Sequence, residues 1–487
     1  MNHINPATNP TPVRPLFHFT PAANWINDPN GLVYYAGEYH LFYQYHPHST
    51  VWGPMHWGHA VSSDLLHWEE LPIALYPDEV GAIFSGSAVI DWQNSAGFGA
   101  EAMVAIFTHD APVGQRQSLA YSTDRGRTWT KYAGNPVIAT PPGEKDFRDP
   151  KVFWYREDNG HGHWVLLLAV ADSIWFYTSP NLIDWRFASE FGKGHGSHAG
   201  TWETPDLFDL VVEEGPARRW VLSVGVGSGA TVDEQGTQYF VGAFDGYTFT
   251  NDNPPSTLLR ADAGPDFYAA QGWNDTPDGR KLWLAWLNNW IYANQIPTGS
   301  WRGAMSIPRE LRLATTPAGL RLVQQPIPEL AKQRGRPYHG QPQTIAATAV
   351  QLADTPSGAL EVLAEFTLAP EQSATIFGLH LDTAAGERTT IGYAVDAERL
   401  FIDRTRSGQI DFNAAFATRY EAPLTPADGV VRLHLLIDQT SIELFGNDGL
   451  AALTAQIFPT NHQRTITLFA QEGIVHLSQL DLWPLVL

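Results

Sequence analysis

A short motif that ends in an aromatic residue recurs about every 60 residues through the first two thirds of the chain, a period that suits four-stranded propeller blades with long loops. Its copies are S-S-D-L-L-H-W ending at Trp68, S-T-D-R-G-R-T-W ending at Trp129, S-P-N-L-I-D-W ending at Trp185, and a degenerate F-D-G-Y-T-F at 244–249. In each copy Asp, Asn or Gly supplies a turn, and the aromatic residue begins an outer strand. About 300 residues at this period predict a β-propeller of five blades.

The remainder of the chain also has the pattern of short strands. Runs rich in Val, Ile, Phe, Tyr and Trp lie between clusters of Gly, Pro, Asn and Asp, and one short stretch, 328–333, has a helical signature with proline in its first turn. Segments 360–368 and 431–437 alternate apolar and polar residues and, with 468–482, predict a β-sandwich. We therefore expect an all-β chain with a flexible tail at 1–14, a five-bladed β-propeller at 15–313, a linker at 314–340 and a C-terminal β-sandwich at 341–487.

Composition excludes several classes of partner. The chain has 487 residues, of which 44% are hydrophobic and 17% charged, so it is globular and too long for one ordinary core. Its net charge of -21 would repel phosphate backbones and anionic lipids, so we expect neither nucleic acid nor a membrane as a partner. The 18 tryptophans suit either a β-rich core or flat walls that stack on sugar rings.

The start of the chain carries no apolar run. Residues 1–15 are polar and rich in proline, which is not the pattern of a signal peptide, and no later stretch has the length and hydrophobicity of a membrane span. A cytoplasmic protein is the default expectation, or a secreted one if a leader has been removed. The absence of cysteine excludes disulfides and thiolate metal sites.

Three acidic residues stand in unusual surroundings of aromatic residues, glycine and proline. They are Asp28 in W-I-N-D-P-N-G, Asp149 in F-R-D-P and Glu203 in W-E-T-P-D-L-F. Their spacing places them on the first, third and fourth blades, whose innermost strands deliver side chains to a central funnel. An acid before proline is kept out of the helical region, so we expect Asp28 and Asp149 to be extended.

Paired carboxylates of this kind can split a glycosidic bond, because one protonates the leaving oxygen while the other meets the cationic sugar centre. The structural alternative is that each acid only accepts hydrogen bonds from backbone amides at a turn or strand end.

The same motifs give the chain a resemblance to a known family. It resembles the family 32 glycoside hydrolases and, within them, the exo-acting fructan β-fructosidases, from about residue 15 to the C-terminus. The fold that this resemblance implies is a five-bladed propeller followed by a β-sandwich. The motifs that carry it are W-I-N-D-P-N-G, F-Y-Q-Y-H-P, W-G-P-M-H-W-G-H-A, F-S-G-S-A, F-R-D-P-K, W-E-T-P-D-L-F, Q-Y-F-V-G-A-F-D-G, D-F-Y-A-A-Q and W-R-G-A-M-S-I-P-R-E-L.

The resemblance also implies roles for individual residues. Asp28 is expected to be the nucleophile, Glu203 the acid/base, and Asp149 the residue that grips sugar hydroxyls in the transition state. No metal or organic cofactor is implied. Thr204 departs from the family, which usually has cysteine there, and we expect its hydroxyl to hydrogen-bond a nearby carboxylate. The residues expected to line the terminal fructose pocket are Asn27, Gln44, Trp52, Phe84, Ser85, Arg148 and Trp290.

Three functions remain open from the sequence: an exo-hydrolase of levan or inulin, a sucrose-directed invertase or transfructosylase, and an inactive carbohydrate-binding propeller. The two enzymes would share every catalytic residue and differ in loops around the leaving group, such as 192–200 and 225–236. Several histidine pairs lie close in sequence, but none stands at a metal-binding spacing with a carboxylate, so we expect no metal site.

Overall fold

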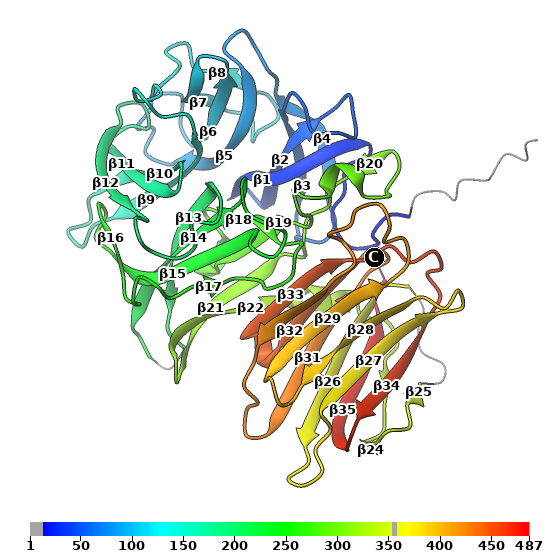
Figure 1. The fold of residues 1–487 in the computed structure, drawn as a ribbon. Helices are drawn as coiled ribbons and strands as arrows, with labels where there is room; N and C mark the ends of the chain where they lie inside the picture. The colour runs from blue at the N-terminus through cyan, green and yellow to red at the C-terminus, as the bar shows by residue number, and fades with distance from the viewer. Residues whose placement is uncertain (1–12, 214, 353–357, 487) are drawn as a thin grey trace, which may run out of the picture.

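The chain is built from β-strands. The computed structural model describes residues 13–213, 215–352 and 358–486, and over these residues it contains strands and four short 3-10 helices but no α-helix (Figure 1). The all-β prediction is therefore confirmed. Within the described part of the chain, no helix is long and apolar enough to cross a membrane. The expected tail, 1–14, lies outside the described residues except for Val13 and Arg14.

Five sheets form from the described residues between 24 and 326. The first contains β1 (Asn24–Tyr35), β2 (Glu38–His46), β3 (His56–Ser62), β4 (Glu69–Leu75) and the late strand β20 (Trp301–Arg302). The second contains β5 (Ala82–Asp91), β6 (Ala102–Ala111), β7 (Gly114–Ser122) and β8 (Thr130–Lys131). The third contains β9 (Phe147–Arg156), β10 (Gly162–Val170), β11 (Ser173–Ser179) and β12 (Arg186–Phe191).

The fourth sheet contains β13 (Trp202–Val211), β14 (Arg218–Val226), β15 (Gly236–Phe244), β16 (Phe249–Asn251) and β17 (Leu259–Arg260). The fifth contains β18 (Tyr268–Gly272), β19 (Leu282–Trp286), β21 (Arg309–Thr316) and β22 (Gly319–Pro326). The short helices are η1 (Pro277–Gly279), η2 (Ala293–Gln295), η3 (Pro328–Gln333) and η4 (Asn447–Gly449).

The first strand of each of these sheets lies toward a common centre (Figure 1). In chain order β1 contacts β5, β5 contacts β9, β9 contacts β13 and β13 contacts β18, while β18 contacts β1. Asp28, Asp149 and Glu203 lie on β1, β9 and β13, and so on the first, third and fourth sheets, as their spacing predicts. The five strands β1, β5, β9, β13 and β18 are called the inner strands below.

The recurring aromatic motif forms the turn between the third and fourth strands of a sheet. In its first copy the Ser62 hydroxyl accepts hydrogen bonds from the backbone N–H groups of Asp64 and Leu65, and the Asp64 carboxylate accepts from those of Leu66 and His67. The serines and acidic or amide residues of the next two copies make similar bonds. The predicted turns are confirmed, and each tryptophan stands directly before the outer strand.

The fifth sheet continues beyond the end expected for it. β21 and β22 pair as an antiparallel hairpin from Arg309 to Pro326, so residues 314–326 of the predicted linker are mostly strand. This stretch has the proline content of a connector, but Pro326 pairs with Arg309 at the end of the hairpin, and Pro328 begins the helix η3 that follows. The helical signature at 328–333 is confirmed as the 3-10 helix η3.

Two further sheets form from residues 338 onward. The first contains β23 (Tyr338–His339), β24 (Gln343–Ile345), β26 (Leu360–Leu368), β31 (Val430–Ile437), β32 (Ser441–Gly446), β33 (Ala451–Gln456) and β35 (Val475–Pro484). The second contains β25 (Val350–Gln351), β27 (Ile376–Thr383), β28 (Arg388–Ala394), β29 (Arg399–Arg406), β30 (Arg419–Pro423) and β34 (Arg464–Gln471). We call these two sheets the C-terminal unit.

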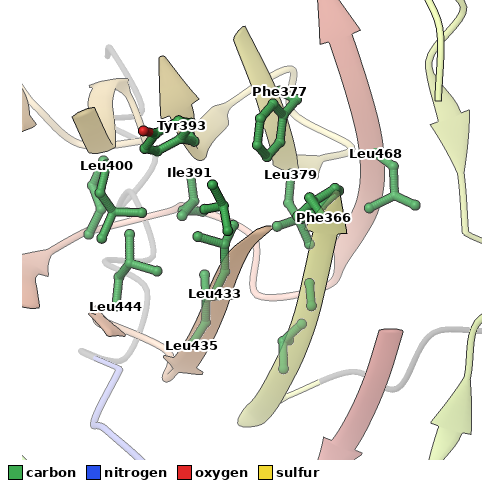
Figure 2. Close-up of a cluster of buried hydrophobic side chains, with 14 of the residues drawn as sticks. Phe366, Phe377, Leu379, Ile391, Tyr393, Leu400, Leu433, Leu435, Leu444 and Leu468 are labelled. Carbon is green, nitrogen blue, oxygen red and sulfur yellow. The ribbon is translucent and has the colours of Figure 1, made fainter. Parts of the chain in front are cut away.

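The inward side chains of these two sheets form one apolar core (Figure 2). Phe366 and Leu433 from the first sheet meet Phe377, Leu379 and Ile391 from the second, and all five are fully or almost fully buried. Burial of each such side chain stabilises the fold by about 1.5–3 kcal/mol. The alternation of apolar and polar residues along β26 and β31 therefore arises from one buried face and one wet face.

A buried ionic network joins the C-terminal unit to the five sheets. Arg309 of β21 forms ion pairs with Asp262 at 3.0 Å and with Glu443 of β32 at 2.5 Å. Glu443 also contacts Nε2 of His18, whose Nδ1 contacts Asp438, each at 2.8 Å. All five side chains are fully buried. Buried charges are tolerated only when they are paired in this way, so the network fixes how the two parts fit together.

His18 makes the stability of this junction depend on pH. Burial alone would lower its pKa, but its hydrogen bonds to Asp438 and Glu443 outweigh burial and raise the pKa to about 9. The folded pKa exceeds the unfolded value of about 6.5, so the stabilisation is complete below about pH 6.5 and is lost as the pH rises through about 9. We expect the free energy of unfolding to fall by about 3 kcal/mol across this window.

Urea denaturation of wild type, His18→Gln and the exposed-site control His67→Gln across this window would measure the effect. His18→Gln should have a flatter profile than the other two. Equal slopes in all three proteins would contradict the assignment.

Candidate active site

A cavity of about 510 Å³ opens where the inner strands meet, and all ten residues singled out from the sequence line it. They come from four of the inner strands, β1, β5, β9 and β13, from the neighbouring strand β2, and from two loops. Their roles remain predictions, but the convergence is a property of the fold. The ten residues are Asn27, Asp28, Gln44, Trp52, Phe84, Ser85, Arg148, Asp149, Glu203 and Trp290.

Each inner strand carries one extra residue at the level of this cavity. Two residues of the inner strand stand opposite one residue of its partner. The shifts in pairing register fall between Ile26 and Pro29, Ile83 and Gly86, Arg148 and Lys151, Glu203 and Asp206, and Tyr268 and Gln271. A β-bulge of this kind bends a strand and re-aims a side chain. Five bulges at one level therefore turn the inner strands toward a common site.

The bulges also change the backbone of the site residues. Asp149, Thr204 and Ala269 have φ values of 62°, 48° and 56°, which is the left-handed region that side chains other than glycine rarely adopt. The expectation of an extended Asp149 is therefore wrong. Proline after Asp149 excludes the right-handed helical region, but it leaves the left-handed region accessible when an extra residue must be accommodated.

Asp28 is held by neutral hydrogen-bond donors. The Ser85 hydroxyl donates to Oδ2 at 2.6 Å and the Asn27 amide donates to Oδ1 at 3.0 Å. Burial raises the pKa of Asp28, the two hydrogen bonds oppose that rise, and the nearby charge of Glu203 adds to it. Among the described residues no cation forms an ion pair with Asp28. Its carboxylate is therefore buried, oriented and free of a counter-ion, as a nucleophile requires.

Arg148 is the cation that lies beside the other carboxylates of the cavity, those of Asp146, Asp149 and Glu203. It contacts Glu203 at 2.7 Å and Asp146 at 2.5 Å, and it lies 3.9 Å from Asp149. Its shortest contacts are therefore to Glu203 and Asp146, and not to its sequence neighbour Asp149. Burial raises the pKa of Asp149 to about 7, since the charge of Arg148 only partly offsets burial and the charges of Asp28 and Glu203.

Tyr268 is a site residue that the sequence analysis did not single out. Its hydroxyl donates to Oε2 of Glu203, while Arg148 donates to Oε1, so both oxygens of Glu203 are oriented. Burial raises the pKa of Tyr268 well above 10, so the hydroxyl keeps its proton. A Cβ at Gly227 would lie 2.1 Å from the Tyr268 hydroxyl and 2.4 Å from Glu203, so only glycine fits beside this pair. Tyr268 is the tyrosine of the motif D-F-Y-A-A-Q, so its place in a family motif could have identified it.

Thr204 behaves differently from our expectation. Its backbone N–H donates to Oδ2 of Asp149 at 2.9 Å, but its buried hydroxyl has no hydrogen-bond partner in the described part of the chain. The predicted bond from the hydroxyl to a carboxylate is wrong, because the positive φ at this bulge turns the amide toward Asp149.

Other wall residues were also not singled out from the sequence. Of the two loops considered for the leaving-group side, 225–236 reaches the cavity, whereas no residue of 192–200 lines it. Within the described ranges, no group of three or more histidine, aspartate or glutamate residues has the geometry of a metal site. The further lining residues are Gln115, Asp146, Ser228, Gly229, Ala230, Gln235 and Ile291.

The cavity thus combines a buried carboxylate held by neutral donors with a second carboxyl oriented by a tyrosine and an arginine. A pair of carboxyl groups with different surroundings can divide the tasks of proton donor and nucleophile, which is the chemistry of glycoside hydrolases.

Comparison with known proteins also indicates a glycoside hydrolase. Residues 18–326 match the profile of the glycosyl hydrolases family 32 N-terminal domain, and residues 329–484 match the family 32 C-terminal profile. The chain therefore belongs to glycosyl hydrolase family 32.

Three relatives illustrate the match. A levanase of Bacillus subtilis (strain 168) is 53% identical over 97% of this chain and 70% of its own length. The crystal structure of an exo-inulinase from Aspergillus awamori superposes with a TM-score of 0.90 at 38% identity, covering 98% of this chain and 99% of that one. A fructofuranosidase variant from Schwanniomyces occidentalis in complex with fructosylnystose superposes with a TM-score of 0.89 at 32% identity, covering 97% and 98%.

Removal of the Ser85 hydroxyl should move the pH dependence of hydrolysis. Its hydrogen bond favours the charged form of Asp28, so Ser85→Ala raises the pKa of that carboxyl and a higher pH is needed to ionise it. We expect the acid limb of the kcat/KM profile to shift upward by about one pH unit. Ser87→Ala is the matched control, since the Ser87 hydroxyl bonds the backbone of Val152. An unshifted limb in Ser85→Ala would refute this role.

Proposed function

We propose that the five sheets are the blades of a five-bladed β-propeller and that the C-terminal unit is a β-sandwich. The cyclic contacts of the inner strands support the first part. So does β20, which returns late in the chain to pair in parallel with β1 and ties the last sheet to the first. The shared core between the two C-terminal sheets supports the second part.

We further propose that the protein is a retaining exo-hydrolase that releases terminal β-D-fructofuranosyl units from levan- and inulin-type fructans and from sucrose. The observation that carries this proposal is the meeting of Asp28, Asp149 and Glu203 in one cavity. Relatives that are a levanase, an exo-inulinase and a fructofuranosidase support the choice of fructosyl substrates.

In the first half of the reaction, ionised Asp28 attacks the anomeric carbon of the terminal fructosyl unit. The bond from that carbon to the leaving oxygen breaks, and protonated Glu203 gives its proton to this oxygen. An ester between Asp28 and the sugar results. Tyr268 and Arg148 keep Glu203 in the orientation that proton transfer requires.

In the second half, Glu203 is ionised and takes a proton from a water molecule. The water oxygen bonds to the anomeric carbon, the ester bond to Asp28 breaks, and fructose leaves with its original configuration. Two inversions at one carbon give overall retention. Both halves use only side chains of the chain and water, and no cofactor enters.

Asp149 would accept hydrogen bonds from sugar hydroxyls that strengthen as positive charge develops on the ring. Trp52, Phe84 and Trp290 offer apolar walls, and Asn27 and Gln44 offer polar groups. A cavity of about 510 Å³ has the size that encloses a small ligand, which favours the end of a fructan chain over its middle.

Product analysis with levan, inulin and sucrose tests the proposal. We expect free fructose as the first product from each substrate, because the proposed exo action removes one terminal unit at a time. Asp28→Ala and Glu203→Ala should release none while melting like wild type, whereas the exposed-acid control Asp158→Ala should remain active.

The other outcomes separate the alternatives. Oligosaccharides as first products would contradict exo action, and activity confined to sucrose, or transfer products, would favour an invertase or transfructosylase. No activity on any of the three would favour an inactive carbohydrate-binding propeller. Fructose release by Asp28→Ala would sink the assignment of the nucleophile.

A further inference from the structure

Arg404 of the C-terminal unit reaches into the junction with the propeller and is fully buried there. Its guanidinium donates to Oδ2 of Asp266 at 2.7 Å, to the Tyr292 hydroxyl at 3.0 Å and to the backbone carbonyl of Phe416 at 2.7 Å. The ring of Phe416 stacks under it at 3.8 Å. A planar donor with partners on several sides is held in one orientation, so it can act as a rigid support.

The two propeller residues that bind Arg404, Asp266 and Tyr292, each stand two residues from a residue of the active site. Asp266 precedes the bulge that carries Tyr268, the donor to Glu203. Tyr292 follows Trp290, which lines the cavity and stacks on Trp25. The Tyr292 hydroxyl also donates to Oδ1 of Asp266 at 2.6 Å, which closes a triangle of three buried groups.

The segment around Trp290, residues 287–296, contains no strand and depends on the C-terminal unit for part of its hydrogen bonding. The Gln456 amide donates to the carbonyl of Leu287 at 3.0 Å. Asn413 donates to the carbonyl of Ile291 at 3.2 Å and to the Gln295 side chain at 2.9 Å. Contacts at both ends and the middle of this segment therefore come from across the junction.

We propose that Arg404 is a positioning residue for the active site: through Asp266 and Tyr292 it holds Tyr268 against Glu203 and Trp290 in the cavity wall. The C-terminal unit thus determines the shape of the fructosyl site as well as covering one flank of the propeller. This inference rests on the proposed function for its kinetic consequences, but the positioning itself can be measured without a substrate.

Tyr292→Phe is the most selective test, because it removes one hydroxyl and leaves the Arg404–Asp266 ion pair. The matched control is Tyr393→Phe, a buried tyrosine of the C-terminal unit whose hydroxyl donates to the carbonyl of Leu424 at 2.7 Å. For sucrose we expect Tyr292→Phe to raise KM about 3- to 10-fold with kcat changed less, since the wall contacts the bound sugar in ground and transition states alike. The control should leave both constants unchanged.

Hydrogen exchange of residues 287–296, followed by mass spectrometry, gives a readout that needs no turnover. Exchange should become faster in Tyr292→Phe and stay at the wild-type rate in Tyr393→Phe. Unchanged exchange together with an unchanged KM in Tyr292→Phe would overturn the proposal. Wild-type protein that releases no fructose would refute the proposed function instead, and the exchange data would still decide the role of the junction.

Arg404→Met and Arg404→Lys extend the test to the arginine. Displacement of groups at a reacting centre by about 1 Å can cost about 100-fold, so we expect kcat/KM to fall between about 10- and 100-fold in Arg404→Met. Lysine keeps the charge beside Asp266 but lacks the second donor for Tyr292, so it should recover part of the loss. Wild-type kcat/KM in folded Arg404→Met would contradict the proposal, and if that variant does not fold, Tyr292→Phe decides.

Discussion

The active-site geometry depends on one extra residue in each inner strand. In a regular strand the side chains alternate between two faces, so consecutive residues could not turn toward one cavity. The bulges at Asp28, Ser85, Asp149, Thr204 and Ala269 break that alternation at a single level, while pairing resumes on either side. The positive φ values of Asp149, Thr204 and Ala269 are the local backbone strain that this arrangement requires.

The side chains that the bulges turn into the cavity carry more negative than positive charge. This imbalance affects the protonation of the carboxyl groups and the kind of ligand that the cavity favours. Among the described residues that line the cavity, four have carboxyl groups, Asp28, Asp146, Asp149 and Glu203, and Arg148 is the single cation. Burial and mutual repulsion raise the pKa values of Asp28 and Asp149, so the group of acids readily retains a proton. Such a site favours a neutral ligand rich in hydroxyl donors, and its carboxyl groups are the ones to which we assign the acid and the base of the proposed hydrolysis.

The sequence was sufficient for features that depend on local contacts. The turn before Trp68 recurs because its serine and aspartate bond the adjacent backbone, and the acids of the site stand in long motifs. The sequence was insufficient where a backbone conformation or a side-chain partner depends on how the strands pair. The left-handed φ of Asp149 follows from a bulge, as does the lack of a partner for the Thr204 hydroxyl among the described residues. The role of Tyr268 follows from the position of a distant strand, and residues 314–326 of the hairpin resemble a connector in composition.

The configuration of the sugar at the moment of release reports whether Asp28 forms a bond to the substrate. NMR spectra recorded in the first turnovers of sucrose or levan, before mutarotation, distinguish the two anomers of fructofuranose. We expect the β-anomer to form first, since two displacements at one carbon retain configuration. Initial formation of the α-anomer would mean that water attacks directly, and it would contradict the assignment of Asp28 as nucleophile.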